Sequence, residues 1–212
     1  MRCSSVAGAA VLGYLIGTFP TADLVAARVS NGSVDLRTAG TGNPGGANAL
    51  KVLGAKAGAM VMAGDVAKGA LASGVGALVA GPAGAHLAGS ASVVGHCFPV
   101  WTGFRGGKGV AASVGQCLAT FPAYFPIDMA VAAVTVSNPR WKQRAFTATM
   151  VSSAAWVLGG LVWWRKRWPN LWGPRPSFGL PLASAVSSAV IAYKFSTARP
   201  PVVVASTASV TS

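Results

Sequence analysis

The stretch AGAMVMAGDVAKGALASGVGALV, residues 57–79, decides the fold. It is an apolar run long enough to cross the ~30 Å hydrocarbon core of a membrane as a helix. Gly, Ala and Ser recur along it, and such small residues let membrane helices approach closely. Asp65 and Lys68 are its only charges, and their spacing of three puts them on one helix face, where they can pair. Charges buried in a membrane often mark a functional site, so the pair could contact substrate directly. A purely structural ion pair between the two residues fits equally well.

Other apolar runs lie on both sides of this stretch, and each must be helical in lipid to satisfy its own backbone. Some are shorter than the ~20 residues of a full span, and residues 121–126 predict a bend between two of them. The sequence therefore predicts an all-α integral membrane protein with about seven transmembrane helices. We expect one membrane domain over residues 1–199 and a disordered tail at 200–212. The other runs are 6–27, 85–100, 110–120, 123–136, 145–164 and 178–193.

The composition agrees with a membrane protein. Charged residues make up 10% of the 212-residue chain and hydrophobic residues 52%, whereas an ordinary soluble domain has about 25% charged residues. The net charge of +13 does not indicate a nucleic-acid partner, because the bases lie between apolar runs; an anionic membrane suits it better. Cys3, Cys97 and Cys117 form no C-x-x-C pair, which argues against a metal site or a disulfide framework. We expect no metal, no cofactor and a monomer.

The distribution of loop charge predicts the orientation. Residues 28–56, 101–108 and 138–144 are rich in Lys and Arg. Because cytoplasmic loops carry an excess of these bases, we expect all three on the cytoplasmic side of the plasma (inner) membrane. Residues 165–176 disagree with simple alternation. Either a span is miscounted, or this loop departs from the positive-inside tendency. Its bases are Arg165, Lys166, Arg167 and Arg175.

Two glycine-rich loops on the predicted cytoplasmic side carry the candidate site. The first, residues 35–51, combines several Gly with Asn, Thr and flanking bases. Glycine lets the backbone approach a ligand closely, and successive N–H groups form anion sites. An ordinary polar turn, the alternative, needs only one or two such residues. Lys51 or Arg37 supplies charge. The candidate site residues of this loop are Thr41, Gly42, Asn43, Gly45, Asn48 and Lys51.

The second glycine-rich loop leads directly into the apolar run that begins at Val110. A helix N-terminus with a nearby Lys is a ready phosphate site. The loop is not a Walker A motif, because Thr102 stands where that motif needs Gly and Gly109 follows Lys108 where it needs Ser or Thr. ATP is therefore disfavoured as a ligand. The alternative is a basic turn that only anchors to lipid headgroups. His96 is either a general base or a packed residue that braces the loop. The candidates here are His96, Arg105, Gly106, Gly107, Lys108 and Gly109.

Together these motifs resemble a known family. TGNPGGAN at 41–48, GDVAKG at 64–69, GHCFP at 95–99 and GGKGVA at 106–111 resemble, in order and spacing, the bacterial acyl-phosphate:glycerol-3-phosphate acyltransferases, the PlsY family. The resemblance covers roughly residues 13–122, and beyond them rests on hydropathy and the region of Arg144. It implies an inner-membrane enzyme of seven helices that transfers a fatty acyl group from acyl phosphate to the sn-1 hydroxyl of glycerol 3-phosphate. The products are lysophosphatidate and phosphate, and no metal, CoA or acyl carrier protein takes part.

The chemistry that the resemblance implies also suits what the sequence lacks. No Ser-His-Asp arrangement or G-x-S-x-G elbow is evident, and none is needed, because acyl phosphate is already an activated mixed anhydride. The enzyme must orient two anions and stabilise an oxyanion. The candidate catalytic residues are Thr41, Asn43, His96 and Lys108, with Asp65 and Lys68 as a supporting pair. Either the substrate phosphate or His96 accepts the proton.

This chain departs from the family pattern at several positions. Thr41 stands where the family usually has Ser, and Lys51 where it usually has Arg, which loses bidentate geometry. Residues 46–47 replace Ala-Thr, so one hydroxyl is lost. The largest departure is at the C-terminus, where the family has a basic Arg-His-x-x-Asn motif and a nearby Glu. Phe195 and Ala198 lie roughly at the His and Asn positions, and the chain contains no Glu.

These departures leave two alternatives to a working acyltransferase. One is a divergent paralogue that keeps the fold with weak or lost activity. The other is a small membrane transporter or anion-binding protein that uses the same loops for phosphorylated ligands. The retained glycines and Lys108 of the second loop argue against complete decay of the site.

Overall fold

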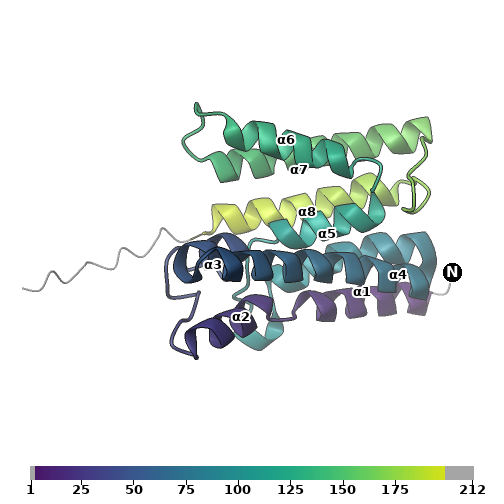
Figure 1. The fold of residues 1–212 in the computed structure, drawn as a ribbon. Coiled ribbons are helices and arrows are strands. Elements are labelled where there is room, and N and C mark those ends of the chain that lie inside the picture. The colour runs from purple at the N-terminus through teal and green to yellow at the C-terminus, as the bar shows by residue number, and fades with distance from the viewer. Residues whose placement is uncertain (1–2, 199–212) are drawn as a thin grey trace, which may run out of the picture.

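The computed structural model describes residues 3–198, so the tail predicted at 200–212 lies outside the described residues. Within this range every regular element is a helix and no strand occurs, as expected from the sequence (Figure 1). The helices are α1 Cys3–Gly17, α2 Thr21–Ser30, α3 Gly46–Leu53, α4 Ala55–Cys97, the 3-10 turn η1 Val100–Thr102, α5 Val110–Thr120, α6 Phe125–Ser137, α7 Arg144–Lys166 and α8 Gly179–Ser196.

The helices have the length and composition of a membrane protein. Three helical stretches of the described chain are long and apolar enough to cross a membrane: Ser4–Ser30, Ala55–Thr102 and Arg144–Lys166. Val110–Thr120 and Phe125–Ser137 are shorter apolar helices, with the bend between them that the sequence predicted. The chain is an all-α integral membrane protein.

Helix α4 is a hairpin of two antiparallel halves. Its backbone leaves the helical region at Ala80 and at Gly81, where φ is 61°, and Pro82 follows without an N–H to donate. Gly76 and Gly84 then face each other, and a Cβ on either would overlap the carbonyl of the other. The apolar runs 57–79 and 85–100 are therefore paired arms, and the pairing brings residues about thirty positions apart to the same level.

The first apolar run, residues 6–27, is not one continuous helix. It breaks between α1 and α2, where Pro20 has no N–H to continue the α-helical ladder. The Thr18 hydroxyl donates to the Leu15 carbonyl at 2.7 Å and closes the end of α1. At this break the Phe19 carbonyl accepts the Thr21 N–H at 2.9 Å and a hydrogen bond from Lys68 at 3.2 Å.

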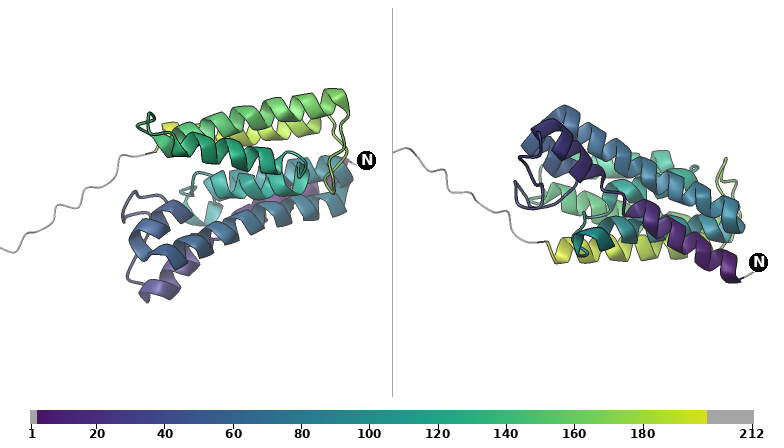
Figure 2. Two further views of the ribbon diagram at one scale, coloured as in Figure 1. Left: turned by 45° about the horizontal axis from the view of Figure 1, so that its top comes forward. Right: turned by 90° about the horizontal axis from the view of Figure 1, so that it is seen from below.

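Small residues bring the helix backbones of the bundle close together. A Cβ on Gly13 of α1 would meet the backbone of Ala88, and a Cβ on Gly69 of α4 would meet that of Ala112 in α5. A polar contact joins three helices inside the bundle, since Ser187 of α8 donates to the Gln116 side chain at 2.7 Å and Gln116 donates to Ser90 at 3.1 Å. Helices α6 and α7 form a separate layer over α5 and α8 (Figures 1 and 2).

The connections gather at two opposite ends of the bundle. Helices α2 and α3 and the turn between α6 and α7 lie at one end, which we call the site end (Figures 1 and 2). The start of α1 and the loop between α7 and α8 lie at the other. The first glycine-rich loop is partly helical, because α3 begins at Gly46.

Candidate functional site

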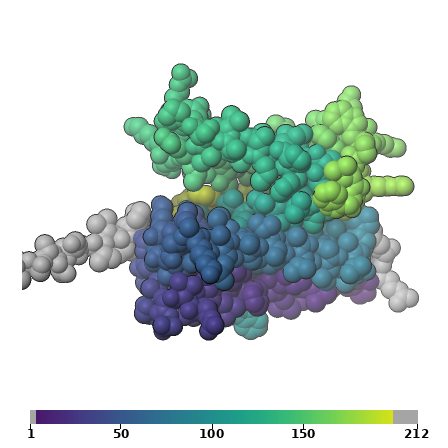
Figure 3. Space-filling view, in the orientation of Figure 1, coloured from purple at the N-terminus to yellow at the C-terminus, as the bar shows by residue number. Residues whose placement is uncertain are grey.

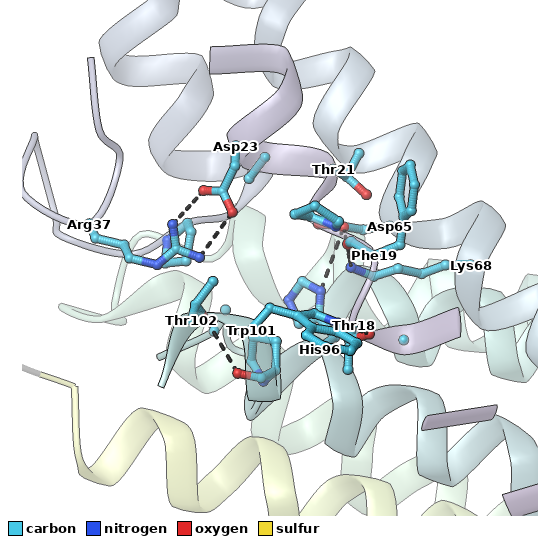
Figure 4. A pocket seen from close by; sticks show the side chains of 17 residues that line it. Thr18, Phe19, Thr21, Asp23, Arg37, Asp65, Lys68, His96, Trp101 and Thr102 are labelled. Carbon is cyan, nitrogen blue, oxygen red and sulfur yellow. Dashed lines mark hydrogen bonds and ion pairs between the residues drawn. The ribbon is translucent and has the colours of Figure 1, made fainter. Parts of the chain in front are cut away.

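A small pocket near the site end joins parts of the chain that are distant in sequence (Figure 4). The break between α1 and α2 forms one wall, and both halves of α4 form another. The second glycine-rich loop closes it, and the first contributes Arg37 and Pro44. The residues of the lining used below are Thr18, Phe19, Asp23, Arg37, Asp65, Lys68, His96, Trp101, Gly106 and Gly107.

Three buried polar side chains lie together on one side of this pocket. Lys68 Nζ lies 2.9 Å from Asp65 Oδ1, so the pair expected from the spacing of three forms. His96 Nδ1 lies 3.5 Å from the same carboxylate oxygen. The side chains are only 2–7% exposed. Since α4 folds back on itself, the hairpin brings His96 to Asp65, and Lys68 and His96 approach the same carboxylate oxygen.

The second loop is tied to the end of α4 through its backbone. The N–H of Gly106 donates to the Cys97 carbonyl at 3.2 Å, and that of Gly107 donates to the His96 carbonyl at 3.1 Å. These two amides, which the sequence suggested as phosphate donors, are therefore occupied. Their glycines matter for space instead, because a Cβ on Gly107 would overlap Nε2 of His96.

The start of α5 keeps the character of an anion site. Gly109 precedes it with φ of 87°, a conformation that favours glycine, and no side chain caps the helix. The first N–H groups of a helix without a cap attract anions. Lys108 precedes the first residue of this helix by two positions.

The buried Asn48, which is 1% exposed, holds the first loop together through its side-chain hydrogen bonds. Its Oδ1 accepts the Thr41 N–H at 2.8 Å, and its Nδ2 donates to the carbonyls of Leu36 and Ala39 at 3.0 and 2.9 Å. In this structure the Asn48 side chain therefore holds the loop, and it does not line the pocket. Thr41, Gly42, Asn43 and Gly45 also lie outside the pocket lining, on the loop around Pro44.

Comparison with known proteins decides the family. The model of the family described as glycerol-3-phosphate acyltransferase matches residues 7–199. The chain belongs to this family. It is 44% identical over 131 residues to the glycerol-3-phosphate acyltransferase of Geobacillus kaustophilus (strain HTA426), a match that covers 62% of this chain and 66% of that protein, just under two thirds.

Solved structures agree with the family match. The crystal structure of PlsY (YgiH), an integral membrane glycerol 3-phosphate acyltransferase, in its glycerol 3-phosphate form has a TM-score of 0.71 and 26% identity, covering 91% of this chain and 88% of that one. Its lysophosphatidic acid form has a TM-score of 0.69 and 25% identity, covering 90% and 87%. The sequence resemblance to the PlsY family is confirmed.

The C-terminal departure from the family pattern contacts the second glycine-rich loop but does not line the pocket. Phe195 of α8 packs beside the second loop, and Lys108 Nζ lies 4.2 Å from the centre of its ring. Burial lowers the pKa of Lys108 below the ordinary lysine range, and the positive charge of Lys51 lowers it further. We call Lys51 and Lys108 the basic rim. Neither lines the pocket, and Arg105 is exposed on the loop beside them.

The pocket also contains contacts that the sequence did not predict. Asp23 of α2 forms a bidentate ion pair with Arg37, and Arg37 Nε donates to the Arg105 carbonyl at 2.9 Å, which joins the two loops. Trp101 donates from Nε1 to the Thr18 hydroxyl at 3.0 Å. Asp23 lies in the first apolar run, 14 positions from Arg37 and on another element, so spacing along one helix could not reveal the pair.

Proposed function

We propose that this protein transfers a fatty acyl group from acyl phosphate to the sn-1 hydroxyl of glycerol 3-phosphate, giving lysophosphatidate and phosphate. The observation that carries the proposal is the buried group of Asp65, Lys68 and His96 in a pocket closed by the GGKG loop, in a chain of this family. Relatives of this fold are known in a glycerol 3-phosphate form and a lysophosphatidic acid form.

The reaction needs positioning and charge neutralisation more than a nucleophile. The sn-1 oxygen attacks the acyl carbonyl carbon, a new C–O ester bond forms, and the bond between that carbon and the phosphate oxygen breaks. The departing phosphate carries the electron pair. Because both substrates are anions, their repulsion must be offset before they approach.

The basic rim supplies the positive charge. Lys51 repels Lys108, and a bound phosphate relieves this repulsion by pairing with both ammonium groups. The uncapped start of α5 adds its N–H groups. In contrast, Lys68 is already paired with Asp65, so we assign it to the structure of the pocket.

Two proton acceptors fit the pocket. The leaving phosphate takes the hydroxyl proton directly, or His96 takes it through Nε2, the ring nitrogen on the side of Gly107. Asp65 lies near the other ring nitrogen and orients the imidazole for the second route. A His96→Gln variant separates them, since it retains turnover only if phosphate is the acceptor.

We further propose that the site end faces the cytoplasm across the inner membrane. Seven helical segments run alternately between the two ends: α1, the two halves of α4, and α5 to α8 (Figures 1 and 2). The bases of 28–56, 101–108 and 138–144 support this orientation. The loop at 165–176 then departs from the positive-inside tendency.

The direct test supplies purified protein with acyl phosphate and labelled glycerol 3-phosphate and follows labelled lysophosphatidate. Lys108→Ala removes a charge-assisted contact worth about 1.5–3 kcal/mol and should lower kcat/KM for glycerol 3-phosphate about 10- to 100-fold. Lys56→Ala, which removes an exposed base outside the candidate site residues, is the matched control and should retain most activity. Equal activity of the two variants would count against the role of Lys108, and no product from the folded wild type would favour a non-enzymatic anion-binding protein.

A further inference from the structure

The end of the bundle opposite the site carries a cluster of Trp and basic residues. It spans the last turn of α7 and the loop before α8, which protrudes from the bundle (Figures 1 and 3). We call residues 163–176 the basic-aromatic loop. All four of its bases are exposed, as are Trp168 and Trp172. The Trp and basic residues of this loop are Trp163, Trp164, Arg165, Lys166, Arg167, Trp168, Trp172 and Arg175.

The protein provides no counter-ion for these bases. In the part of the chain that the structure describes, no ion pair includes any of the four. The chain has only 4 acidic residues. Asp23, Asp35 and Asp65 form ion pairs at the site end, and Asp128 accepts a hydrogen bond from Ser152. Charge complementarity therefore requires an anion from outside the chain.

The basic-aromatic loop is fixed against α5. The buried Asn170 donates from Nδ2 to the carbonyls of Thr120 and Pro174, at 3.0 and 2.7 Å. Trp172 donates from Nε1 to the Leu118 carbonyl at 3.3 Å. The bases consequently lie on a fixed surface at the end of the apolar helix α7, which is the depth at which basic and aromatic residues meet lipid headgroups.

An apolar groove of about 650 Å³ runs beneath this loop. Small residues of α4, including Gly74 and Ala77, form its floor, and Leu118 and Ala119 of α5 form one side. Residues 172–174 cover its end, and Arg175 follows them directly. The groove lies on a different face of α4 from Asp65 and Lys68, so it is separate from the candidate site.

We propose that the basic-aromatic loop and this groove bind one anionic phospholipid, with its phosphate on the bases and an acyl chain in the groove. The guanidinium fork of Arg matches phosphate oxygens in two-point contacts. Trp rings at the same depth suit the membrane interface. The small residues of the groove leave room for a hydrocarbon chain, and burying that chain against apolar surface is favourable.

The first test measures lipid preference of the full chain in a neutral detergent. Native mass spectrometry follows binding of phosphatidylglycerol and of phosphatidylcholine with the same acyl chains. We expect at least a tenfold preference for phosphatidylglycerol, since each base near an anionic lipid contributes about fivefold. Changing all four loop bases to Gln should abolish the preference. The matched control changes Arg28, Arg140, Lys142 and Arg144 at the site end and should retain it. Equal binding of the two lipids by the wild type would overturn the proposal.

The second test addresses the groove and does not depend on charge. A Cβ on Gly74 meets nothing within 4 Å, so Gly74→Leu fills the groove without a clash. Gly8→Leu on α1 adds the same side chain at another open position and is the control. Gly74→Leu should weaken phosphatidylglycerol binding at least tenfold, and Gly8→Leu and Lys108→Ala should not. Unchanged binding in Gly74→Leu, or full competition by inorganic phosphate alone, would refute a lipid site. If the four-base variant does not fold, Arg175→Gln against Arg175→Lys tests the same charge.

Discussion

Replacing Phe195 by His tests whether the proposed acyltransferase activity is weakened at the C-terminal motif. In the structure the Phe195 ring holds the Lys108 ammonium at 4.2 Å, a cation–π contact worth about 0.5–1 kcal/mol at a half-exposed site. A bound phosphate must compete with that ring for Lys108. An imidazole in its place frees the ammonium and adds a hydrogen bond to a charged oxygen, worth about 1.5–3 kcal/mol. The lower sum is about 2 kcal/mol, or roughly a 30-fold rise in kcat/KM.

A second substitution separates the two contributions. Phe195→Leu frees Lys108 without adding a donor, so it should raise kcat/KM for glycerol 3-phosphate only about 2- to 5-fold. The assay is lysophosphatidate formation by purified protein, with thermal unfolding as a control, because Phe195 also packs against Phe146 at 5.5 Å between ring centres. Ala198→Asn, added to Phe195→His, should raise activity further. Activity of Phe195→His at or below that of Phe195→Leu, with equal stability, would refute the reasoning.

Further predictions concern pH, the second loop and the orientation. The pKa of Lys108 is lowered, so its ammonium loses the proton at a lower pH than an ordinary lysine. We therefore expect kcat/KM to fall on the basic side at a pH below the ordinary lysine range. Lys108→Arg should move that fall to higher pH, and an unchanged basic limb would exclude Lys108 as its source. Gly107→Ala should displace the His96 ring and lower kcat at least about tenfold at similar stability; normal kcat would show that the ring position is not critical. In a cysteine-free background of intact cells, an impermeant thiol reagent should label Cys at Ser177 and miss Cys at Ser33; the reverse pattern would invert the proposed orientation.

The long apolar helices were predictable from hydropathy, because an apolar segment in lipid must be helical to satisfy its own backbone. The run expected at 110–120 coincides with α5, and that expected at 145–164 lies within α7. The break at Pro20 was readable in principle, but the apolar run continued across it and hid the division into α1 and α2. Helix α3 was missed because its glycine and asparagine residues are typical of a loop as well as of a helix start.

The site was predictable by residue type but less by role. Spacing was sufficient for the Asp65–Lys68 pair, since both partners lie on one helix. It was insufficient for His96, which reaches Asp65 only through the hairpin at Gly81, and for Asn48, whose partners are backbone carbonyls. The role of a glycine is also ambiguous in sequence. The sequence suggested that the Gly107 N–H binds an anion, whereas in the structure that N–H donates to the His96 carbonyl and the missing side chain leaves room for the His96 ring.

The positions of the charges suggest why the family motif can erode at the C-terminus without loss of the fold. Asp65, Lys68 and His96 are buried and paired among themselves, so they belong to the packing of α4 and depend on no substrate. The positive charge of Lys51 adds to burial in lowering the pKa of Lys108, and in the proposed function a bound phosphate offsets this repulsion. Phe195 lies in this second group and contacts Lys108 through its ring. If the proposed function is correct, a change there alters how tightly phosphate is held, while the pocket around Asp65, Lys68 and His96 stays assembled.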